Sequence, residues 1–524
     1  MKRVTLLYPA ARRRIGKLST HHLPGLATPH SGLPILATIL TAKGYDVRVY
    51  DESVTPFDER MFDDADFVGI SIQTAWAERG YALAERARAR GILVAFGGAH
   101  ATLAPDNAIL HGDFVIRGEG ERTLPELLGA LSVDATTLNA ILGLTYRDAG
   151  VVKHNPDRPM LTGDELDALP FPDMTRIAGL DRIARAPLNQ FVYQTMVSRG
   201  CSMKCTFCSV AQTFRDFRHR SVANVLEELG SRFNPTTQFL FFQDDSIGCD
   251  PEWLKALLDG MRRAKLVPKL GWHSQMRVDV ARDKDLVRLM RETNCYFATF
   301  GFESINPRSL KTMGKGQSPH DIRRTIETMR TNGIYVNGFF VVGTDDDDLA
   351  TIDATLEFAL DSGCVVAGFM PLTPFPGTPL HERLAHEERI FTDDWELYDV
   401  QHVVFFPKRM TPKALYTGLL GAYRKFYSAA NLWRKAIDIA RRTQHWFHLL
   451  IGPSWPIVKQ IDLAVERLSN HDYLRMLTRL QGPGHPKVSL NHEPKGVHDF
   501  IAGRRLRSVY SRACGVRYGF DHHA

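Results

Sequence analysis

The sequence contains few cysteines and no long apolar segment. Only 7 of the 524 residues are cysteine, and an odd number in so long a chain argues against a disulfide framework. No run of about 18 uncharged apolar residues occurs, so we expect no transmembrane helix. Arg12, Arg13 and Arg14 interrupt the apolar start of the chain, which predicts a first strand and not a signal peptide. We therefore expect a cytoplasmic protein of two or three domains.

Charge is distributed unevenly along the chain. Residues 401–524 contain 20 Lys and Arg against 7 Asp and Glu, a balance of +13, and the net charge of +6 leaves −7 for residues 1–400. A basic segment of this kind is typical of a solvated helical surface. It can also bind anionic lipid, nucleic acid or an acidic partner.

Residues 1–135 alternate short apolar runs with helical patterns. The runs lack the polar alternation of a half-exposed strand, so they predict a parallel, doubly wound, Rossmann-like sheet. Ligands of such sheets bind beyond the carboxyl ends of the strands, where Gly97, Gly98 and Gly118 occur. The predicted strands are 4–8, 45–50, 67–72, 92–96 and 114–116, and the predicted helices are 33–42 and 78–90.

A weakly patterned, proline-punctuated linker is predicted over 136–188, and a second strand–helix series follows over 189–385. Six units at this spacing predict a (β/α) barrel, complete or partial, with its chemistry at the strand ends. Residues 386–524 predict a basic, mainly helical C-terminal domain. The strands of the second series are expected at 192–198, 238–243, 269–274, 296–301, 338–342 and 367–372.

Three of the cysteines lie within eight residues. Cys201, Cys205 and Cys208 have the spacing C-x3-C-x2-C directly after a predicted strand. Three thiolates on one loop can ligate three irons of a [4Fe–4S] cluster and leave the fourth iron open. A structural zinc site is the weaker alternative, because it requires four protein ligands and no fourth Cys or His lies close by in sequence.

This spacing, with Phe207 before the last cysteine, resembles the signature of the radical S-adenosylmethionine (SAM) superfamily. The resemblance implies that the amino and carboxylate groups of SAM chelate the open iron. It implies that reduction of the cluster, by an electron donor such as flavodoxin or ferredoxin, cleaves SAM to a 5′-deoxyadenosyl radical. It also implies a place for Phe207 beside the adenine, although Phe207 could be a plain core residue.

Other strand ends match the family more loosely. The resemblance implies that Gln243 and Asp244 bind the amino group of SAM, although acids at this place could equally cap the next helix. Ser274 and Arg277 follow the third strand of the second series, and Arg277 could hold the SAM carboxylate or form a structural salt bridge. The remaining SAM contacts implied are Glu303, at the ribose or the amino group, and Val342, near the adenine.

The segment 373–380 contains the "PGT" stretch common in radical SAM proteins with an N-terminal cobalamin-binding domain. The resemblance to this subfamily implies that cobalamin binds to residues 1–135, with Ser71 and Thr74 at the corrin edge. Residues 9–16 lack the D-x-H-x-x-G motif that supplies a cobalt ligand in many such domains, and a Rossmann-like domain without cofactor is the alternative. The implied contacts to the nucleotide tail are Gly97, Gly98, His100, Gly118 and Glu119.

The resemblance implies a cobalamin-dependent methyltransferase acting on an unactivated carbon of a small-molecule or lipid substrate. Cyclisation or rearrangement by the same machinery is one alternative, and a non-catalytic iron–sulfur protein for electron transfer or redox sensing is another. We expect no nucleic acid partner. Trp433, Trp446, Phe447 and Trp455 lie among basic residues, which is compatible with peripheral membrane contact and also with a helical cap on the barrel. This C-terminal part faintly resembles that of hopanoid-methylating members.

Overall fold

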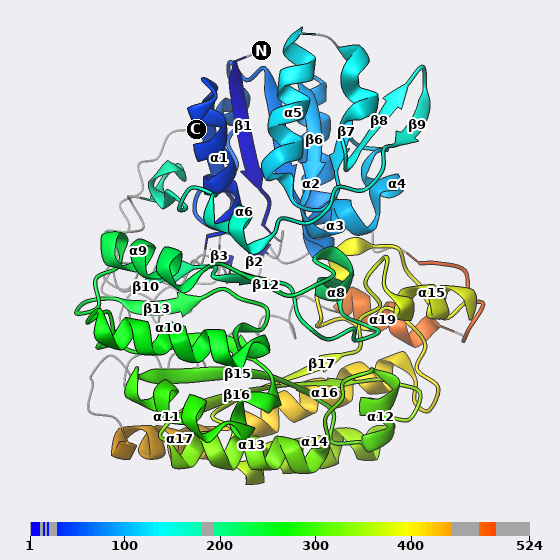
Figure 1. Cartoon of the computed structure of the whole chain (residues 1–524). Helices are drawn as coiled ribbons and strands as arrows, with labels where there is room; N and C mark the ends of the chain where they lie inside the picture. Colours follow the sequence, from blue (N-terminus) through cyan, green and yellow to red (C-terminus); the bar gives the residue numbers. More distant parts are fainter. Residues whose placement is uncertain are drawn as a thin grey trace, which may run out of the picture.

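The computed structural model describes residues 2–10, 14–15, 18–19, 29–133, 135–180, 192–442, 471–480 and 482–488. Figure 1 shows the N-terminal domain at the top of the view and a second sheet with its helices below it. Within the described ranges, no helix is long and apolar enough to cross a membrane.

The N-terminal domain is a seven-stranded sheet in the order β4-β1-β5-β6-β7-β8-β9. The first five of these strands are parallel, and β8 and β9 extend the sheet as an antiparallel hairpin. The strands are β1 (Arg3–Tyr8), β4 (Asp46–Asp51), β5 (Phe67–Ser71), β6 (Leu93–Gly97), β7 (Phe114–Ile116), β8 (Leu144–Asp148) and β9 (Val151–His154).

Helices cover both faces of this sheet, as the unbroken apolar runs predicted. Leu6 and Leu33 belong to one core, with α1 (Gly32–Ala42) and α5 (Gly120–Val133). The neighbouring Leu7 belongs to a second core, with α2 (Ala77–Arg88). Successive side chains of a strand point to opposite faces, so β1 contributes residues to both cores.

The hairpin β8–β9 lies in the segment predicted as linker, so the sheet extends beyond residue 135. Residues 147–148 are exposed, and β9 is mostly exposed. An edge strand with one wet face has a weak apolar signal, which is why the sequence did not reveal it.

The second sheet has six parallel strands in chain order, β10-β13-β14-β15-β16-β17. Every strand–helix unit predicted from the sequence is present, with strand ends displaced by a few residues. The edge strands β10 and β17 are not paired with each other in the described residues. The strands are β10 (Val192–Thr195), β13 (Phe239–Phe242), β14 (Trp272–Met276), β15 (Cys295–Glu303), β16 (Tyr335–Val342) and β17 (Val366–Pro371).

Capped amphipathic helices cover one face of the second sheet. Asp250 caps α10, Ser318 caps α13 with a reciprocal bond from Asp321, and Asp348 caps α14. The helices of this layer are α9 (Val222–Arg232), α10 (Pro251–Arg263), α11 (Lys284–Glu292), α13 (Pro319–Thr331), α14 (Leu349–Ser362) and α16 (Pro412–Phe426).

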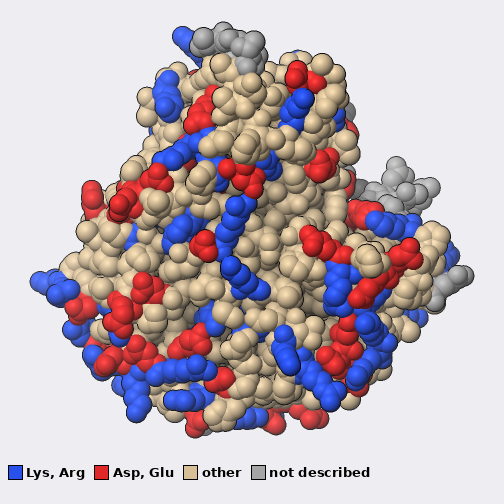
Figure 2. Space-filling model, turned by 45° about the vertical axis from the view of Figure 1, so that its right-hand side comes forward, with Lys and Arg blue, Asp and Glu red and all other residues tan. Residues whose placement is uncertain are grey.

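The C-terminal region completes that helical layer and also reaches the N-terminal domain. Phe369 of β17 meets Phe426 of α16 edge to face at 5.7 Å. Trp395, in the short helix η9 (Trp395–Leu397), donates from its indole nitrogen to Asn107 Oδ1 of the N-terminal domain at 3.2 Å. Two further helices, α17 (Ala429–Arg442) and α19 (His471–Arg479), follow. The face shown in Figure 2 carries Lys and Arg interspersed with Asp and Glu, without a broad field of one sign.

The two sheets meet at the carboxyl ends of the N-terminal strands. In Figure 1, β1 runs downward from the N-terminus, so its carboxyl end points to the second domain. Helix α3 (Gly98–Leu103) packs beside α8 (Ser209–Thr213), the short helix that follows Cys208. A Cβ on Gly377 would lie 3.0 Å from the Leu103 carbonyl oxygen, so the "PGT" stretch also approaches α3 closely.

Candidate active site

The cysteine loop begins where β11 (Ser198–Arg199) ends. Gly200 has φ +81°, and a Cβ there would lie 2.4 Å from the carbonyl oxygen of Asp216, so only glycine fits. The loop is braced by backbone bonds through Thr206, whose N–H donates to Met313 O at 3.1 Å and whose carbonyl accepts from Leu380 N at 3.0 Å. Two segments far away in sequence therefore hold the loop in place.

The three thiols lie in a site where two cations face them. Burial raises the pKa of the Cys205 and Cys208 thiols, while the positive charges of Lys315 and Arg277 act in the opposite sense on Cys205. Thiolates in such surroundings suit iron ligation, because a metal cation stabilises the negative charge that burial destabilises. No three His, Cys, Asp or Glu side chains of the described part converge on a single-ion site. Thiolates that each bind a different iron of a cluster need not converge.

Arg277 has a vacant hydrogen-bonding position. Its Nε and Nη2 donate to Asp279 Oδ2 at 2.9 and 2.6 Å, which is the structural salt bridge that the sequence left open. Its Nη1 is buried and has no hydrogen-bond partner among the described residues. A buried guanidinium nitrogen without an acceptor is costly, so Arg277 fits a site in which a ligand carboxylate supplies that acceptor.

Glu303 ends β15 in a strained conformation. Its φ is +58°, and its carboxylate forms a buried ion pair with Lys315 Nζ at 2.7 Å. Burial acts to lower the pKa of Lys315, but Glu303 and the neighbouring thiols raise it overall, so Lys315 is charged. Positive φ in a residue with a side chain is rare outside glycine and clusters at functional sites. Lys315, between Gly314 and Gly316, was not singled out from the sequence.

The acidic pair after β13 braces the strand that leads to the cysteines. The carboxylate of Asp244 accepts from the N–H and the hydroxyl of Ser198, the latter at 2.5 Å, and Asp245 Oδ2 accepts from Gly200 N at 3.3 Å. Burial raises the pKa of Asp244 to about 7 and that of Asp245 to about 6. A role of Asp244 at the SAM amino group stays a prediction, because these bonds already occupy its carboxylate.

The remaining SAM residues from the sequence lie in different surroundings. Gln243 is bonded through its amide to Gln194, and Phe207 is half-buried against the main core. Ser274 and Val342 are fully buried, and the Ser274 hydroxyl donates to Phe242 O at 3.1 Å. They alternate with residues of the opposite face, which places them on the helix-covered side of the sheet. Their contact with SAM stays a prediction.

The predicted cobalamin residues gather at the carboxyl ends of β5 and β6. A Cβ on Gly97 would meet no atom within 4 Å, so space is open there for a ligand. Gly98 has φ +88°, and its Cβ would lie 2.9 Å from Ser71 Oγ, so this backbone approach requires glycine. The open space beside a glycine-lined strand end fits cobalamin, which the resemblance placed here.

His100 is part of a buried network and not a free side chain. Its Nε2 lies 2.9 Å from the Tyr81 hydroxyl, and its Nδ1 lies 3.3 Å from Thr74 Oγ1. Burial lowers its pKa to about 4, so it is neutral at pH 7. Its ring also meets Trp395 edge to face at 5.1 Å. His100 thus joins the N-terminal domain to the C-terminal region.

A buried charge cluster joins the predicted cobalamin motif to the cysteine loop. Arg199, two residues before Cys201, contacts Glu119 Oε1 at 2.7 Å and Glu121 Oε1 at 2.6 Å. Arg218 contacts both oxygens of Glu119 at 3.0 Å. The four side chains are 12 % exposed or less. Pairing with Glu121 and Glu119 raises the pKa of Arg199 despite its burial, so Arg199 is charged. We call these four residues the interdomain clamp.

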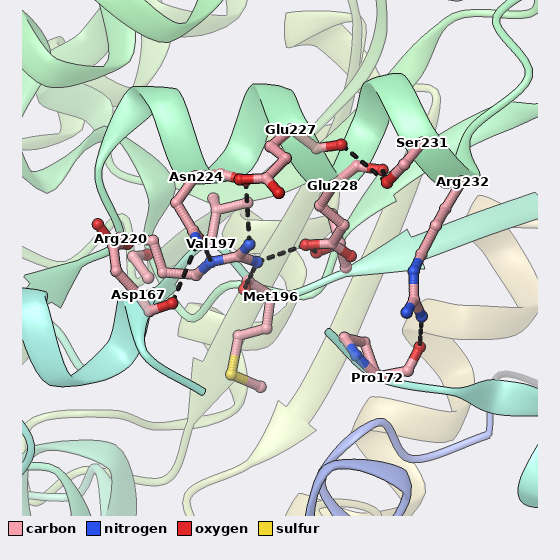
Figure 3. Close-up of polar contacts among 12 residues, drawn as sticks. Asp167, Pro172, Met196, Val197, Arg220, Asn224, Glu227, Glu228, Ser231 and Arg232 are labelled. Atoms are coloured by element: carbon pink, nitrogen blue, oxygen red, sulfur yellow. Dashed lines mark hydrogen bonds and ion pairs between the residues drawn. The ribbon is translucent and has the colours of Figure 1, made fainter. Parts of the chain in front are cut away.

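A small hollow lies behind this clamp, between α1, the linker and the segment from β10 to β11. Figure 3 shows how its wall is fastened: Arg220 is directed at Glu228 and at Asn224 Oδ1 (2.6 Å), and Arg232 donates to Pro172 O at 2.8 Å. The charged groups at this wall are paired with protein partners, so the linker is anchored to α9. The lining residues are Ser31, Ile35, Leu166, Leu169, Pro170, Phe171, Pro172, Met196, Val197, Ser198, Arg199 and Arg220.

One face of the second sheet is not covered by any of the described helices of that layer, and we call it the helix-free face. It carries aromatic rings and a polar row. His273 stacks on Phe241 at 4.9 Å with 8° between the ring planes, and its Nε2 lies 2.8 Å from Thr299 Oγ1. Asn337 donates from its amide nitrogen to the same hydroxyl at 3.2 Å, while its buried Oδ1 has no partner in the part of the chain that the structure describes. Burial lowers the pKa of His273 to about 4, so the ring is neutral. No local pattern predicts this row, because its members lie on three strands.

Two family models match the chain. The radical SAM superfamily model matches residues 195–359, and the B12 binding domain model matches residues 24–128. An uncharacterized methyltransferase of Pyrococcus horikoshii is 30% identical over 416 residues, which are 77% of this chain and 88% of that protein. Bacteriochlorophyllide d C-12(1)-methyltransferase of Chlorobaculum tepidum is 28% identical over 406 residues, 76% of this chain and 83% of that protein.

A solved structure shares the fold. The radical S-adenosylmethionine methyltransferase TsrM of Kitasatospora setae, with cobalamin and a [4Fe-4S] cluster bound, superposes with a TM-score of 0.65. The alignment covers 88% of this chain and 100% of that chain at 16% identity. Both predicted domains, the three-cysteine loop and the relatives agree: the chain belongs to the radical SAM methyltransferases that carry a B12 binding domain.

Proposed function

We propose that the protein methylates an unactivated carbon of a planar small molecule bound on the helix-free face of the second sheet. The observation that carries this proposal is the interdomain clamp. It fastens the segment entering the cysteine loop to the motif Gly118–Glu121 of the B12 binding domain. The groups for radical formation and for methyl transfer are then held at one junction between the two sheets. The six-stranded sheet serves as a partial barrel whose mouth opens to that junction.

The chain's own residues have separate tasks in this site. Cys201, Cys205 and Cys208 hold the cluster, and Lys315 and Arg277 offset its negative charge. Arg277 Nη1 binds the carboxylate of SAM, because that nitrogen is buried without another acceptor. When bound, the cluster with SAM supplies a radical that removes a hydrogen atom, and cobalamin supplies the methyl group. Gly97 leaves room for cobalamin beside the strand end.

The helix-free face suits a planar substrate with a polar edge. Phe241, His273 and Phe297 present flat rings, with His273 and Phe297 edge to face at 5.6 Å. Asn337 Oδ1 can accept from an N–H or O–H group of the substrate and so regain the bond that it lacks. A relative named for a bacteriochlorophyllide, which is a flat ring system, supports this class.

The electron donor and the cellular location of the protein are also part of the proposal. A flavodoxin or ferredoxin delivers the electron to the cluster in the cytoplasm.

On α17, Trp433 is 72% and Ile437 is 37% exposed, one helical turn apart. This apolar pair, with Arg434 beside it, supports peripheral contact with an anionic membrane. Trp446, Phe447 and Trp455 lie outside the described residues. Sedimentation with anionic vesicles tests the contact, and a chain that stays in the supernatant contradicts it.

The function is tested with SAM carrying a trideuterated methyl group. The anaerobically purified protein, loaded with iron, sulfide and cobalamin and then reduced, should form 5′-deoxyadenosine and trideuteromethylcobalamin. Cells fed with labelled methionine should contain a labelled metabolite that disappears when the gene is deleted. Formation of 5′-deoxyadenosine without any label on cobalamin or a metabolite would contradict methylation and leave cyclisation or rearrangement by the same machinery.

A further inference from the structure

A fourth cysteine stands beside the cysteine loop. Cys249 ends the short helix η7 (Ile247–Cys249) after β13, 48 residues beyond Cys201. Its Sγ lies 4.0 Å from Cys201 Sγ and accepts from the hydroxyl of Ser202 at 3.5 Å. Among the described residues this is the one hydrogen bond between two cysteine side chains. Neither the C-x3-C-x2-C motif nor the proposed function uses Cys249.

We propose that Cys201 and Cys249 form a disulfide in the cluster-free protein, and that this disulfide blocks cluster assembly. Both side chains are half-buried, so a small oxidant can reach them. Closing the gap from 4.0 Å to the bonded length of about 2.05 Å needs a movement of about 2 Å. Cys201 lies in an irregular loop and Cys249 in a single helical turn, where such a movement disturbs no long element.

The oxidant is a low-molecular-weight disulfide, and the exchange balances. One cysteine thiolate attacks a sulfur of the small disulfide, which forms a mixed disulfide and releases one small thiolate. The second cysteine then attacks the protein sulfur of the mixed disulfide and releases the other. The two protein thiols lose two electrons and two protons, and the small disulfide is reduced to two thiols.

Cluster binding and the disulfide exclude each other, because both require the sulfur of Cys201. Loss of one of three thiolates leaves too few ligands for the cluster. The disulfide therefore keeps the cluster-free chain in an oxidised form, and a thiol reductant restores its two free thiols. The two remaining described cysteines outside the loop, Cys295 and Cys364, fit this role poorly, because they are buried and distant in sequence from the loop.

Peptide mapping tests the disulfide directly. The cluster-free full chain is treated with oxidised glutathione and digested with trypsin, which cuts after Arg199, Lys204, Arg232 and Lys255. The expected product is peptide 200–204 joined to peptide 233–255, two hydrogens lighter than their sum. Glutathione adducts on the two cysteines without a joined peptide would overturn the proposal, and so would a bond from Cys201 to the peptide that begins at Cys205.

Cluster assembly is the second readout. Oxidised protein should take up iron and sulfide only at background level, which the absorbance of the iron–sulfur cluster measures. Treatment with dithiothreitol should restore the uptake. Protein that already carries its cluster should give no joined peptide. The Cys249→Ala variant should bind the cluster normally when reduced and give no joined peptide, while the control Cys295→Ala should still give it. Failure of reduced Cys249→Ala to bind the cluster would make Cys249 a ligand and overturn the proposal.

Discussion

At the scale of single residues, the cysteines and Arg277 differ in how their roles arise. The three cysteines act through a local spacing that any fold of this loop would preserve. Arg277 acts through a nitrogen that is buried without an acceptor, and only the packed structure shows this. The two cases give different predictions.

Replacing any one of Cys201, Cys205 or Cys208 by Ala should abolish SAM cleavage. Two thiolates cannot hold a cluster with one open iron, so the radical cannot form. Chromatography of 5′-deoxyadenosine formed under reducing conditions measures the effect. Cys295→Ala is the control, since that thiol lies at the start of β15. Retained cleavage in any of the three variants would refute the cluster assignment.

Replacing Arg277 by Gln should weaken SAM binding about tenfold or more while leaving the cluster content unchanged. A lost charge-assisted bond to a carboxylate accounts for a change of about 1.5–3 kcal/mol. Equilibrium binding of SAM to the cluster-loaded protein measures it. Arg282→Gln, in the same segment with its side chain 53% exposed, should bind SAM like the wild type. Equal affinities of the two variants would remove Arg277 from the SAM site.

At the scale of elements, the connection between β13 and β11 determines where the cysteine loop starts. Asp244 follows β13 and holds the backbone of Ser198, and Gly200 can turn because its φ is positive. This brace contains a fully buried carboxyl group, so it makes stability depend on pH.

Stability should fall as the pH rises through the titration of Asp244. Burial raises its pKa from 3.8 to about 7, so the unfolded chain releases the proton first. The contribution is complete below pH 3.8, declines as the pH rises, and is lost above about 7. Melting temperatures at about pH 5.5 and about pH 8 should show the wild type losing more than Asp244→Asn between them. Asp285→Asn, an exposed control, should follow the wild type. Parallel curves for the wild type and Asp244→Asn would contradict the assignment.

At the scale of the whole molecule, the interdomain clamp is a direct link between the B12 binding domain and the segment that leads to the cysteine loop. Its four charges come from residues up to 99 positions apart and lie almost out of solvent. Removing one partner of a buried pair leaves an uncompensated charge, which is far more costly than loss of a surface pair.

Replacing Glu119 by Gln should lower the free energy of unfolding by about 3–5 kcal/mol and reduce the cobalamin retained after gel filtration. Arg199 and Arg218 would both lose a buried partner, and the cysteine loop would no longer be held to the motif. Urea unfolding and the cobalamin spectrum measure the two effects. Glu59→Gln, which removes the exposed pairs with Arg86 and Arg90, should cost about 1 kcal/mol or less. A Glu119→Gln protein that matches this control would show that the clamp has no role.

The architecture was largely predictable because its signals are local. Apolar runs such as 67–72 and capped helices such as α13 follow from neighbouring residues, and the helices on both faces of the first sheet followed from runs without alternation. The hairpin β8–β9 was missed, because a strand with exposed polar residues resembles a linker. The order of chain segments therefore came from the sequence more readily than the limits of each domain.

The motif of three cysteines, its place after a strand and its family can all be identified from the sequence alone. These depend on spacing within eight residues, which folding cannot change. Only the tertiary structure decided what surrounds them: Lys315 facing the thiols, Cys249 beside Cys201, and Glu119 joined to Arg199. Such contacts join residues 48 to 110 positions apart, and no periodicity along the chain encodes them. They arise when segments distant in sequence meet in the folded molecule, within the second domain and between the two domains, so charge and thiol chemistry meet only there.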